Sequence, residues 1–321
     1  MKCKECGSDY EVESISKAGV KLKPAEVAEE DWGEQGLKLS ITFDRLRLEE
    51  KELKSEAEKA GCTTELIDVR KLAFNVTGKR IWNGFGDVVL QRCISYYRSA
   101  FLTRILENFG LNVINTTKVS EACGNKLVTS MLLAKAGVPT PKTYVALSSE
   151  SVFETAKKVG YPVVVKPFTG SWGRMVDIAK EPQTLGTIVE YRESMQNPVE
   201  HMYYLQEYVK RPPRDIRLIV AGDEVIASVY RNAPTGEWRT NVARGGTTTA
   251  FKLNKAIEEV TLRAARAVGG GILGVDAMET EDGRYTVHEV NNTVEFKGAQ
   301  ASTEHRIARK IVEYVMKEAK R

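Results

Sequence analysis

The sequence lacks the features that mark membrane, secreted or repetitive proteins. No apolar run in its 321 residues approaches the roughly 20 residues that a bilayer-spanning helix needs. The amino-terminal stretch Met1–Glu5 carries no apolar signal-peptide segment, and the chain has no internal repeat or low-complexity segment. Hydrophobic residues at 42% and charged residues at 28% are typical of a soluble globular protein. We therefore expect a cytoplasmic protein.

An excess of charge of one sign is also lacking. The 47 lysines and arginines stand against 43 aspartates and glutamates and leave a formal net charge of +4. This bias is too small to indicate nucleic-acid binding by itself. It leaves room for a local basic surface that receives an acidic partner, and we expect no nucleic-acid or membrane partner.

Cysteine is scarce. Five cysteines, an odd number in a long chain, do not suggest a disulfide framework. Cys62, Cys93 and Cys123 lie in mixed apolar surroundings, which is typical of buried thiols. Cys3 and Cys6 differ, because Cys-Lys-Glu-Cys-Gly is one half of a zinc knuckle. A closed zinc site needs four ligands and no second pair follows nearby, so the half-site alone does not establish bound Zn²⁺.

The first part of the chain alternates strands with helices. Apolar strands are expected at 37–43, at 64–68, from 87 and from 111, and amphipathic helices at 48–60 and 100–109. Both helices are followed by a glycine, a common way for a helix to end. The alternation predicts a mostly parallel sheet, whose ligands bind at the carboxyl ends of the strands.

The rest of the chain predicts two α+β lobes. A helix from Asn125 leads into the rigid stretch 138–141, and YPVVVKPFTGSWGRMVDIA then reads as strand, glycine loop and strand. Five later runs are expected to form one antiparallel sheet: YYLQEYV, RDIRLIVAG, EVIASVYRN, VDAMETEDG and YTVHEVNN. Two helices, KAIEEVTLRAARAVG and EHRIARKIVEYVMKEAK, would cover it. The predicted fold is thus of mixed α/β and α+β class, divided into residues 1–36, 37–123, 124–205 and 206–321.

Two lysines accompany the glycine-containing loop. Lys166 lies in an apolar strand, where its charge must meet a negative partner or solvent, and Lys126 opens the preceding helix. Glycines let backbone amides approach phosphate oxygens closely. The loop residues of interest are Thr169, Gly170, Ser171 and Gly173. Taken alone, this loop is equally consistent with an ordinary strand that ends in a turn.

Oxygen-bearing side chains gather late in the sequence. Glu289 and Asn291 are two residues apart on one expected strand, so their side chains share a face. Asp276 is expected to end a neighbouring strand. Two carboxylates and a carboxamide, with no His or Cys among them, suit Mg²⁺ that holds nucleotide phosphates. Alone, the Glu-Val-Asn motif could be a solvated strand end.

Arginines form a third set. They are Arg217, Arg231, Arg239 and Arg244, with Asn241 between the last two. Guanidinium groups are natural clamps for carboxylates and phosphates. Each could be a surface arginine. The full combination of lysines, glycine loop, arginines and oxygen donors in this order is hard to obtain by accident.

In this order the motifs resemble those of the RimK-like ATP-grasp ligases, over about nine tenths of the chain from Leu37. The resemblance is carried by Asn125-Lys126, Val165-Lys166-Pro167, Gln206-Glu207-Tyr208-Val209, Asp215-Ile216-Arg217, RTNVARGG at 239–246, Gly274-Val275-Asp276 and Glu289-Val290-Asn291. The runs ITFDRLRLEEK, VLQRCISYYRSAFLTRILENFGLNVINT, ACGNKLVTSMLLAKAGVPTPKT and EVNNTVEFKGA are most similar to the LysX and ArgX ligases of this family. Those ligases attach α-aminoadipate or glutamate to the amino-group carrier protein LysW.

The resemblance implies an ATP-grasp fold and an acyl-phosphate mechanism. It implies that ATP lies between the two lobes, with its phosphates on Lys126, Lys166 and the glycine loop and its adenine on the hinge formed by Gln206, Glu207, Tyr208 and Val209. Mg²⁺, with two ions expected, would bind Asp276, Glu289 and Asn291. Arg231, Asn241 and Arg244 would orient the acyl phosphate and hold substrate carboxylates, with Asp215 and Arg217 as support near the phosphates. Substrate choice is associated with the segment that contains Asn292, Thr293, Glu295 and Phe296, and dimers or tetramers are common.

The first 36 residues resemble the end of the carrier protein. The carrier ends in Glu-Asp-Trp-Gly-Glu, and its last glutamate offers the side-chain carboxyl that the ligase activates. Residues Glu30–Glu34 match this tail, and Cys3–Gly7 resembles the second of the carrier's two cysteine pairs. Residues 35–38 span at most about 14 Å and lead to the amino end of the first strand, away from the expected site. We therefore expect a separate, full-length carrier, and not Glu34, to be the acceptor.

Two alternative functions stay open. A RimK-like glutamate ligase for another protein tail or a cofactor would share the motifs, although only the carrier hypothesis explains the acidic tail. A zinc-knuckle binding protein with a degenerate nucleotide-binding fold would lack catalytic groups, whereas the two lysines and the three oxygen donors are all present. The amino acid is open too, because α-aminoadipate and glutamate differ by one methylene, worth about 1–3 kcal/mol in a pocket.

Overall fold

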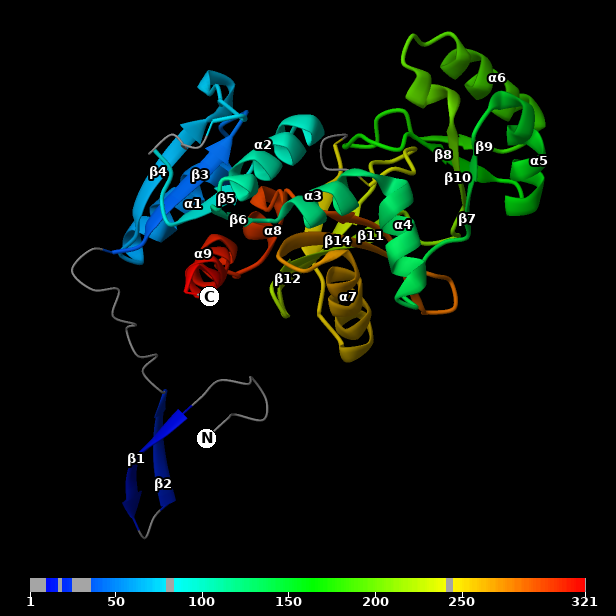
Figure 1. Ribbon diagram of the computed structural model, residues 1–321. Coiled ribbons are helices and arrows are strands. Elements are labelled where there is room, and N and C mark those ends of the chain that lie inside the picture. Colours follow the sequence, from blue (N-terminus) through cyan, green and yellow to red (C-terminus); the bar gives the residue numbers. More distant parts are fainter. Residues whose placement is uncertain (1–9, 17–18, 25–35, 79–83, 241–244, 321) are drawn as a thin grey trace. The chain divides into compact units, whose positions relative to one another are not determined.

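The computed structural model describes residues 10–16, 19–24, 36–78, 84–240 and 245–320. The chain divides into two compact units, Met1–Gly36 and Leu37–Arg321. In the first unit, β1 (Tyr10–Ser16) and β2 (Gly19–Pro24) pair as an antiparallel hairpin (Figure 1). Cys3, Cys6 and the tail at 30–34 lie outside the described residues.

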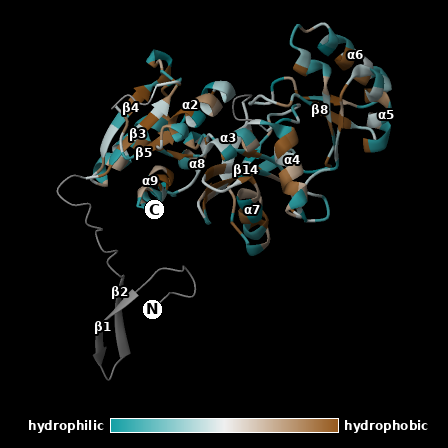
Figure 2. Cartoon of the chain, in the orientation of Figure 1, coloured by the Kyte–Doolittle hydropathy of each residue, from teal (hydrophilic) through white to brown (hydrophobic). Residues whose placement is uncertain are grey.

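The second unit begins with a parallel sheet. Its strand order is β4 (Thr63–Asp68), β3 (Lys38–Phe43), β5 (Val88–Gln91), β6 (Asn112–Ile114), and all neighbours are parallel. Helices α1 (Leu48–Lys59), α2 (Tyr96–Asn108) and α3 (Thr117–Gly124) accompany it (Figure 1). Hydrophobic colour gathers in its strands (Figure 2), as is usual for parallel sheets buried on both faces. The predicted parallel sheet is therefore confirmed.

The second sheet is antiparallel, in the order β7 (Thr143–Ala146), β10 (Tyr203–Glu207), β8 (Val163–Lys166), β9 (Asp177–Ala179). Helix α4 (Lys126–Lys135) precedes it, and α5 (Ser149–Val159) and α6 (Pro182–Glu193) pack on it. The prediction that YYLQEYV joins the later sheet is wrong, because β10 pairs with β7 and β8. Aromatic and apolar residues indicated a strand there, but composition carries no information about the neighbours of that strand.

The third sheet is also antiparallel, in the order β13 (Thr247–Ala250), β12 (Glu224–Asn232), β11 (Arg214–Ala221), β14 (Ile272–Glu279), β15 (Tyr285–Asn291). Helix α7 (Lys255–Val268) covers it through a buried stripe at i, i+4, i+7 and i+11, which runs from Ile257 to Val268. Helices α8 (Lys297–Ser302) and α9 (Ile307–Ala319) follow. Helix α9 was expected only to cover this sheet, but it also packs against α1 and β5 of the parallel-sheet domain (Figure 1).

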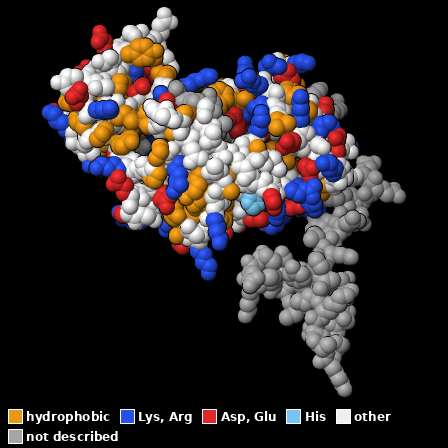
Figure 3. All heavy atoms as spheres, turned by 180° about the vertical axis from the view of Figure 1, so that it is seen from behind, with side chains coloured by type: hydrophobic (Ala, Val, Ile, Leu, Met, Phe, Trp, Pro, Cys, Tyr) orange, Lys and Arg blue, Asp and Glu red, His pale blue; other side chains and the backbone are white. Residues whose placement is uncertain are grey.

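Of the three cysteines in the described part of the chain, two have the buried thiols expected from the sequence. Cys62 and Cys93 are buried, and Cys123 is partly exposed. On the face that Figure 3 shows, cationic and anionic side chains are interspersed, which agrees with the small net charge. Within the described part of the chain, no helix has both the length and the apolarity that a membrane crossing requires.

Candidate active site

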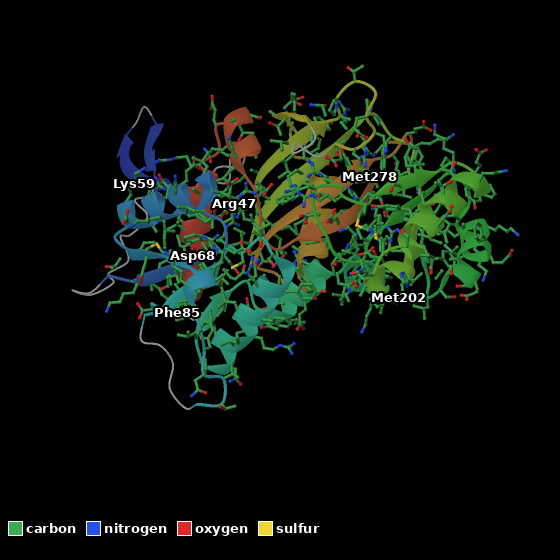
Figure 4. The ribbon with its side chains drawn as sticks, turned by 90° about the horizontal axis from the view of Figure 1, so that it is seen from above. Arg47, Lys59, Asp68, Phe85, Met202 and Met278 are labelled. Carbon is green, nitrogen blue, oxygen red and sulfur yellow. The ribbon has the colours of Figure 1, made fainter. Side chains whose placement is uncertain are left out.

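A cleft of about 810 Å³ lies between the second and third sheets. Its walls come from α4, β8, the loop after β8, the residues after β10, and strands β11, β12, β14 and β15. Met278 on β14 is one of its lining residues and is labelled in Figure 4. The cleft brings together most of the predicted nucleotide-binding residues: Lys126, Lys166, Gly170, Ser171, Gly173, Gln206, Glu207, Tyr208, Val209 and Asp215. Thr169 does not line it. We call this space the nucleotide cleft.

Lys126 ties the glycine loop to the third sheet. It is the first residue of α4, whose amino end is capped by the Asn125 side chain. Its ammonium donates a 2.8 Å hydrogen bond to the carbonyl of Gly170 and lies 3.4 Å from Oε1 of Glu289. Burial favours the protonated form of Glu289, but the positive charges around it, Lys126 first and then Lys166 and Arg217, together outweigh burial and lower the pKa of Glu289 to about 2. Glu289 is therefore ionised at neutral pH.

Lys166 ends β8 and is buried. Its Nζ donates a 2.6 Å hydrogen bond to Oε1 of Gln206, whose amide in turn donates to the Tyr204 hydroxyl and to Thr143. Burial lowers the pKa of Lys166 to about 8, although the nearby Glu289 opposes this. Among the described carboxylates, none lies within ion-pair distance of this ammonium. A buried cation held by a neutral amide is suited to receive an anion such as phosphate.

The glycine loop has an unusual backbone. Gly170 and Gly173 have φ values of 127° and 65°, which glycine adopts readily, but Trp172 and Met175 have φ values of 62° and 56°. Left-handed conformations at non-glycine residues cost on the order of 1–3 kcal/mol and tend to occur at functional sites. Loops of this kind can form anion-binding concavities from successive backbone amides.

The predicted metal ligands converge on one face of the third sheet. Asp276 and Glu289 are direct partners in the β14–β15 ladder, and Asn291 follows two residues later. Asn291 donates a 3.3 Å hydrogen bond to Oδ2 of Asp276. Asp276 lies in the middle of β14 and not at its end, which corrects the sequence-based expectation. Its position comes from antiparallel pairing that the motif did not reveal.

These residues fit Mg²⁺ in chemistry and placement. Two carboxylates and a carboxamide supply only oxygen ligands, which Mg²⁺ prefers. Oδ1 of Asp276 is buried and accepts no hydrogen bond, although it lies 2.8 Å from Nε of Arg217. No group of three His, Cys, Asp or Glu suited to a metal occurs in the described part of the chain. The Asn291 carboxamide would therefore be the third ligand here.

Arg231 is held by two carboxylates. Its Nε and NH2 donate to both oxygens of Asp215 at 2.8 and 2.7 Å, and NH2 lies 3.1 Å from Oδ2 of Asp276. Burial lowers the pKa of Arg231, but the two carboxylates outweigh it and the net effect is a raised pKa. Burial likewise opposes ionisation of Asp215, yet Arg231 lowers the pKa of Asp215 to about 2. Asp215 thereby fixes the direction of the guanidinium.

A second, larger hollow adjoins the nucleotide cleft, and we call it the acceptor hollow. It lies between the parallel-sheet domain and the third sheet. Among its lining residues are Arg47, Tyr96, Cys123, Arg217, Asn291, Asn292, Thr293, Glu295 and Lys297. The two spaces share Gly170, Ser171, Trp172, Arg231, Asp276 and Glu289. The glycine loop, Arg231 and the two carboxylates therefore lie where the spaces meet.

The predicted substrate segment is only partly exposed to the acceptor hollow. Asn292 donates to Ser120, and Thr293 donates to the Cys93 carbonyl, and both residues line the hollow. Phe296 is fully buried and does not line the hollow. This placement runs against the expected substrate contact, because the aromatic ring packs in the core.

Some site residues were not foreseen, and others lie outside the described residues. Trp172, His288 and Trp238 line the nucleotide cleft, and Arg47 lines the acceptor hollow. His288 is the extra residue at a β-bulge between β14 and β15, a feature that can re-aim a side chain. Arg47 bonds Glu295, which is 248 residues away, so no local pattern could have found this pair. The expected Asn241 and Arg244 lie outside the described residues.

Family models match most of the second unit. A model described as the RimK-like ATP-grasp domain matches residues 123–315. A model described as the LysX preATP-grasp domain matches residues 39–122. The two matches meet at the end of α3, where the parallel-sheet domain gives way to α4.

Curated relatives match over most of the chain. The chain is 34% identical over 281 residues to a glutamate–LysW ligase ArgX of Sulfolobus acidocaldarius, which covers 87% of this chain and 98% of that protein. It is 37% identical over 286 residues to an α-aminoadipate–LysW ligase LysX of Sulfurisphaera tokodaii, covering 87% and 99%.

Solved structures show the same fold. A RimK-domain ATP-grasp protein from Sphaerobacter thermophilus superposes with a TM-score of 0.74 at 24% identity, covering 87% of this chain and 99% of that chain. A D-alanine–D-alanine ligase from Bacillus anthracis in complex with ATP superposes with a TM-score of 0.66 at 17% identity, covering 88% and 97%.

Proposed function

Because this chain belongs to the RimK-like ATP-grasp family, we propose that it is an ATP-dependent ligase that joins an amino acid to the carrier protein LysW. It joins the α-amino group of α-aminoadipate, glutamate or both to the side-chain carboxylate of the carrier's C-terminal glutamate, in lysine or arginine biosynthesis. Its LysX and ArgX relatives are named for these reactions. The observation that carries the proposal is the meeting of the nucleotide cleft and the acceptor hollow at six shared residues.

The nucleotide cleft has the charges that ATP needs. The adenine would lie against Gln206–Val209, at the end of β10 and just after it, and the phosphates against Lys126, Lys166 and the glycine loop. Lys166 is suited to this role because it is buried and hydrogen-bonded to a neutral amide. Mg²⁺, as two ions, would be held by Asp276, Glu289 and Asn291, and would neutralise charge on the phosphates.

The proposed reaction has two steps, phosphoryl transfer and amide formation. A carboxylate oxygen of the acceptor attacks the terminal phosphorus of ATP, the bond from that phosphorus to the bridging oxygen breaks, and ADP leaves. The amine nitrogen then attacks the carbonyl carbon of the acyl phosphate, loses a proton as the amide forms, and inorganic phosphate leaves. Arg231 lies where the two spaces meet, so its guanidinium can stabilise charge on the transferred phosphoryl group. Positioning and electrostatics suffice, and no covalent side-chain nucleophile is needed.

Asn241 and Arg244 complete the proposed catalytic set. They follow Thr240, whose hydroxyl donates to Asp215, the carboxylate that holds Arg231. Arg217 pairs with Asp276 and lines the acceptor hollow, which suits support near the phosphates. Asn292, Thr293 and Glu295 also line that hollow and are proposed to take part in substrate choice. Arg231 is proposed to contact substrate carboxylates as well.

The acceptor is proposed to be a separate, full-length carrier. Residues 30–34 resemble the carrier's acidic tail, and the segment 1–36 is proposed to be part of a carrier fused to the ligase. Lys38 begins β3, whereas Arg47, beyond the other end of that strand, lines the acceptor hollow. The six residues of β3 span about 20 Å, and this length separates Lys38, where the amino-terminal segment joins the strand, from the end of the strand near the hollow. Mass spectrometry of the isolated monomer after reaction should show no adduct on Glu34.

The proposal is tested by turnover with purified components. The chain is incubated with ATP, Mg²⁺, full-length carrier protein and either glutamate or α-aminoadipate. Carrier-dependent release of ADP with at least one amino acid is the expected result, and its absence with both would contradict the proposal. Light scattering on the same sample measures the oligomeric state, for which the family resemblance favours a dimer or tetramer.

A further inference from the structure

The Glu295 carboxylate joins three segments of the second unit that are distant in sequence. The indole Nε1 of Trp172, in the glycine loop, donates to Oε2 of Glu295 at 3.4 Å. Arg47 NH1 donates to Oε1 of the same carboxylate at 3.2 Å. Arg47, labelled in Figure 4, lies just before α1 and is itself fixed by Glu50, 2.6 Å away. Glu295 therefore connects the glycine loop to the parallel-sheet domain.

The contact lies where the chemistry would occur. Trp172 lines both the nucleotide cleft and the acceptor hollow, and Glu295 and Arg47 line the acceptor hollow. The backbone of Trp172 is left-handed, with φ of 62°, a conformation that persists only where surrounding contacts hold it. Two such contacts are the bond to Glu295 and the guanidinium of Arg174, 4.9 Å from the centre of the ring system. Trp172 is thus held as part of the wall between the two spaces.

We propose that Trp172, Glu295 and Arg47 form a closing contact that protects the acyl phosphate from water. Trp172 and Glu295 are positioning residues in this proposal, which rests on the proposed ligase function. An acyl phosphate reacts with the amine to give the amide and phosphate. If water attacks the same carbonyl carbon, the products are the original carboxylate and phosphate, and one ATP is consumed without an amide. Excluding water therefore decides how much ATP yields product.

The proposal is tested with two variants and one matched control. Trp172→Phe keeps an aromatic ring but removes the N–H donor to Glu295. Glu295→Gln keeps an oxygen that can accept from the indole but removes the charge that pairs with Arg47. Tyr191→Phe is the control, because Tyr191 is an exposed aromatic residue on α6 and lines neither space.

The first readout is the ratio of ADP released to amide formed at saturating carrier and amino acid. The unsubstituted chain and Tyr191→Phe should give equal amounts of both. Trp172→Phe should raise the ratio by about two- to tenfold, the change in population that the loss of one hydrogen bond produces. Glu295→Gln should raise it less. A ratio that stays unchanged in Trp172→Phe, even with slower turnover, would overturn the proposal.

The second readout does not depend on the acceptor. Amide hydrogen exchange of residues 169–175 is measured with bound ADP and Mg²⁺. The loop should exchange faster in Trp172→Phe than in the unsubstituted chain or in Tyr191→Phe. Equal exchange in all three would overturn the closing contact itself. If the unsubstituted chain forms no amide with either amino acid, the proposed function fails instead, and this exchange comparison still decides whether the contact exists.

Discussion

Lys166 provides a sharp test of the nucleotide cleft through pH. Burial lowers the pKa of Lys166 to about 8, although the negative charge of Glu289 acts to raise it. If phosphate binding requires the charged ammonium, ADP should bind about tenfold more weakly at pH 9 than at pH 7, which corresponds to about 1.4 kcal/mol. Calorimetric titration of ADP with Mg²⁺ across pH 6–9 measures this. An affinity that does not change up to pH 9 would refute the assignment.

Substitution by arginine isolates the charge. Lys166→Arg keeps a cation over the whole pH range, so any affinity that it retains should lose the inflection near pH 8. Lys135→Arg is the matched control, because Lys135 is exposed at the end of α4 and does not line the cleft. It should keep the pH profile of the unsubstituted chain. The same inflection in Lys166→Arg would mean that another group titrates.

The same burial should carry a cost in stability. The folded-state pKa of Lys166, about 8, lies below the 10.5 of a free lysine, so the unfolded chain binds more protons between these two values. Stability from this group therefore rises with pH across that window, by about 3 kcal/mol in all at 1.4 kcal/mol per unit. Lys166→Met removes the buried charge but also the hydrogen bond that Lys166 donates to Gln206. The variant should unfold at an equal or higher urea concentration at pH 7, and it should bind no ADP. A marked loss of stability would contradict this reasoning.

Three further predictions concern other parts of the site. Arg231→Lys loses the paired hydrogen bonds to Asp215, so kcat should fall about a hundredfold. The affinity for ADP, measured by calorimetry, should stay within about twofold of its original value. A loss of ADP affinity with unchanged kcat would contradict the proposed role of Arg231. Glu289→Gln should raise the Mg²⁺ concentration for half-maximal rate, and an unchanged Mg²⁺ curve would count against it as a ligand. Gly124→Ala would place a Cβ 2.0 Å from the Tyr96 ring and should lower the free energy of unfolding, measured with urea, by about 1–3 kcal/mol. An unchanged free energy of unfolding would contradict this.

Local motifs predicted the chemistry of the site better than its surroundings. Lys126 and Lys166 could be singled out from the sequence because each has a recognisable local setting, a capped helix start and an apolar strand end, and the structure places both in the nucleotide cleft. Of the proposed metal ligands, Glu289 and Asn291 could be paired through their two-residue spacing on one strand. The ladder then places Asp276 opposite Glu289, which no spacing along the chain encodes.

What the sequence could not predict depends on contacts between distant segments. The run YYLQEYV has the aromatic and apolar composition of a strand, but its pairing with β7 and β8 is set by tertiary structure. Phe296 follows the Glu-Val-Asn motif closely along the chain, yet its side chain is buried in the core. Glu295 gained its two partners from segments 123 and 248 residues away. Tertiary structure alone defines such pairs.

The proposed function requires that this chain attach an amino acid to the terminal glutamate of a separate carrier protein. The most direct measurement is the intact mass of full-length carrier after incubation with the chain, ATP, Mg²⁺ and glutamate or α-aminoadipate, followed by fragmentation to locate the change. We expect one added amino-acid residue on the carrier's C-terminal glutamate, formed only when ATP is present. An unmodified carrier with both amino acids, or an adduct on Glu34 of the ligase chain instead, would contradict it.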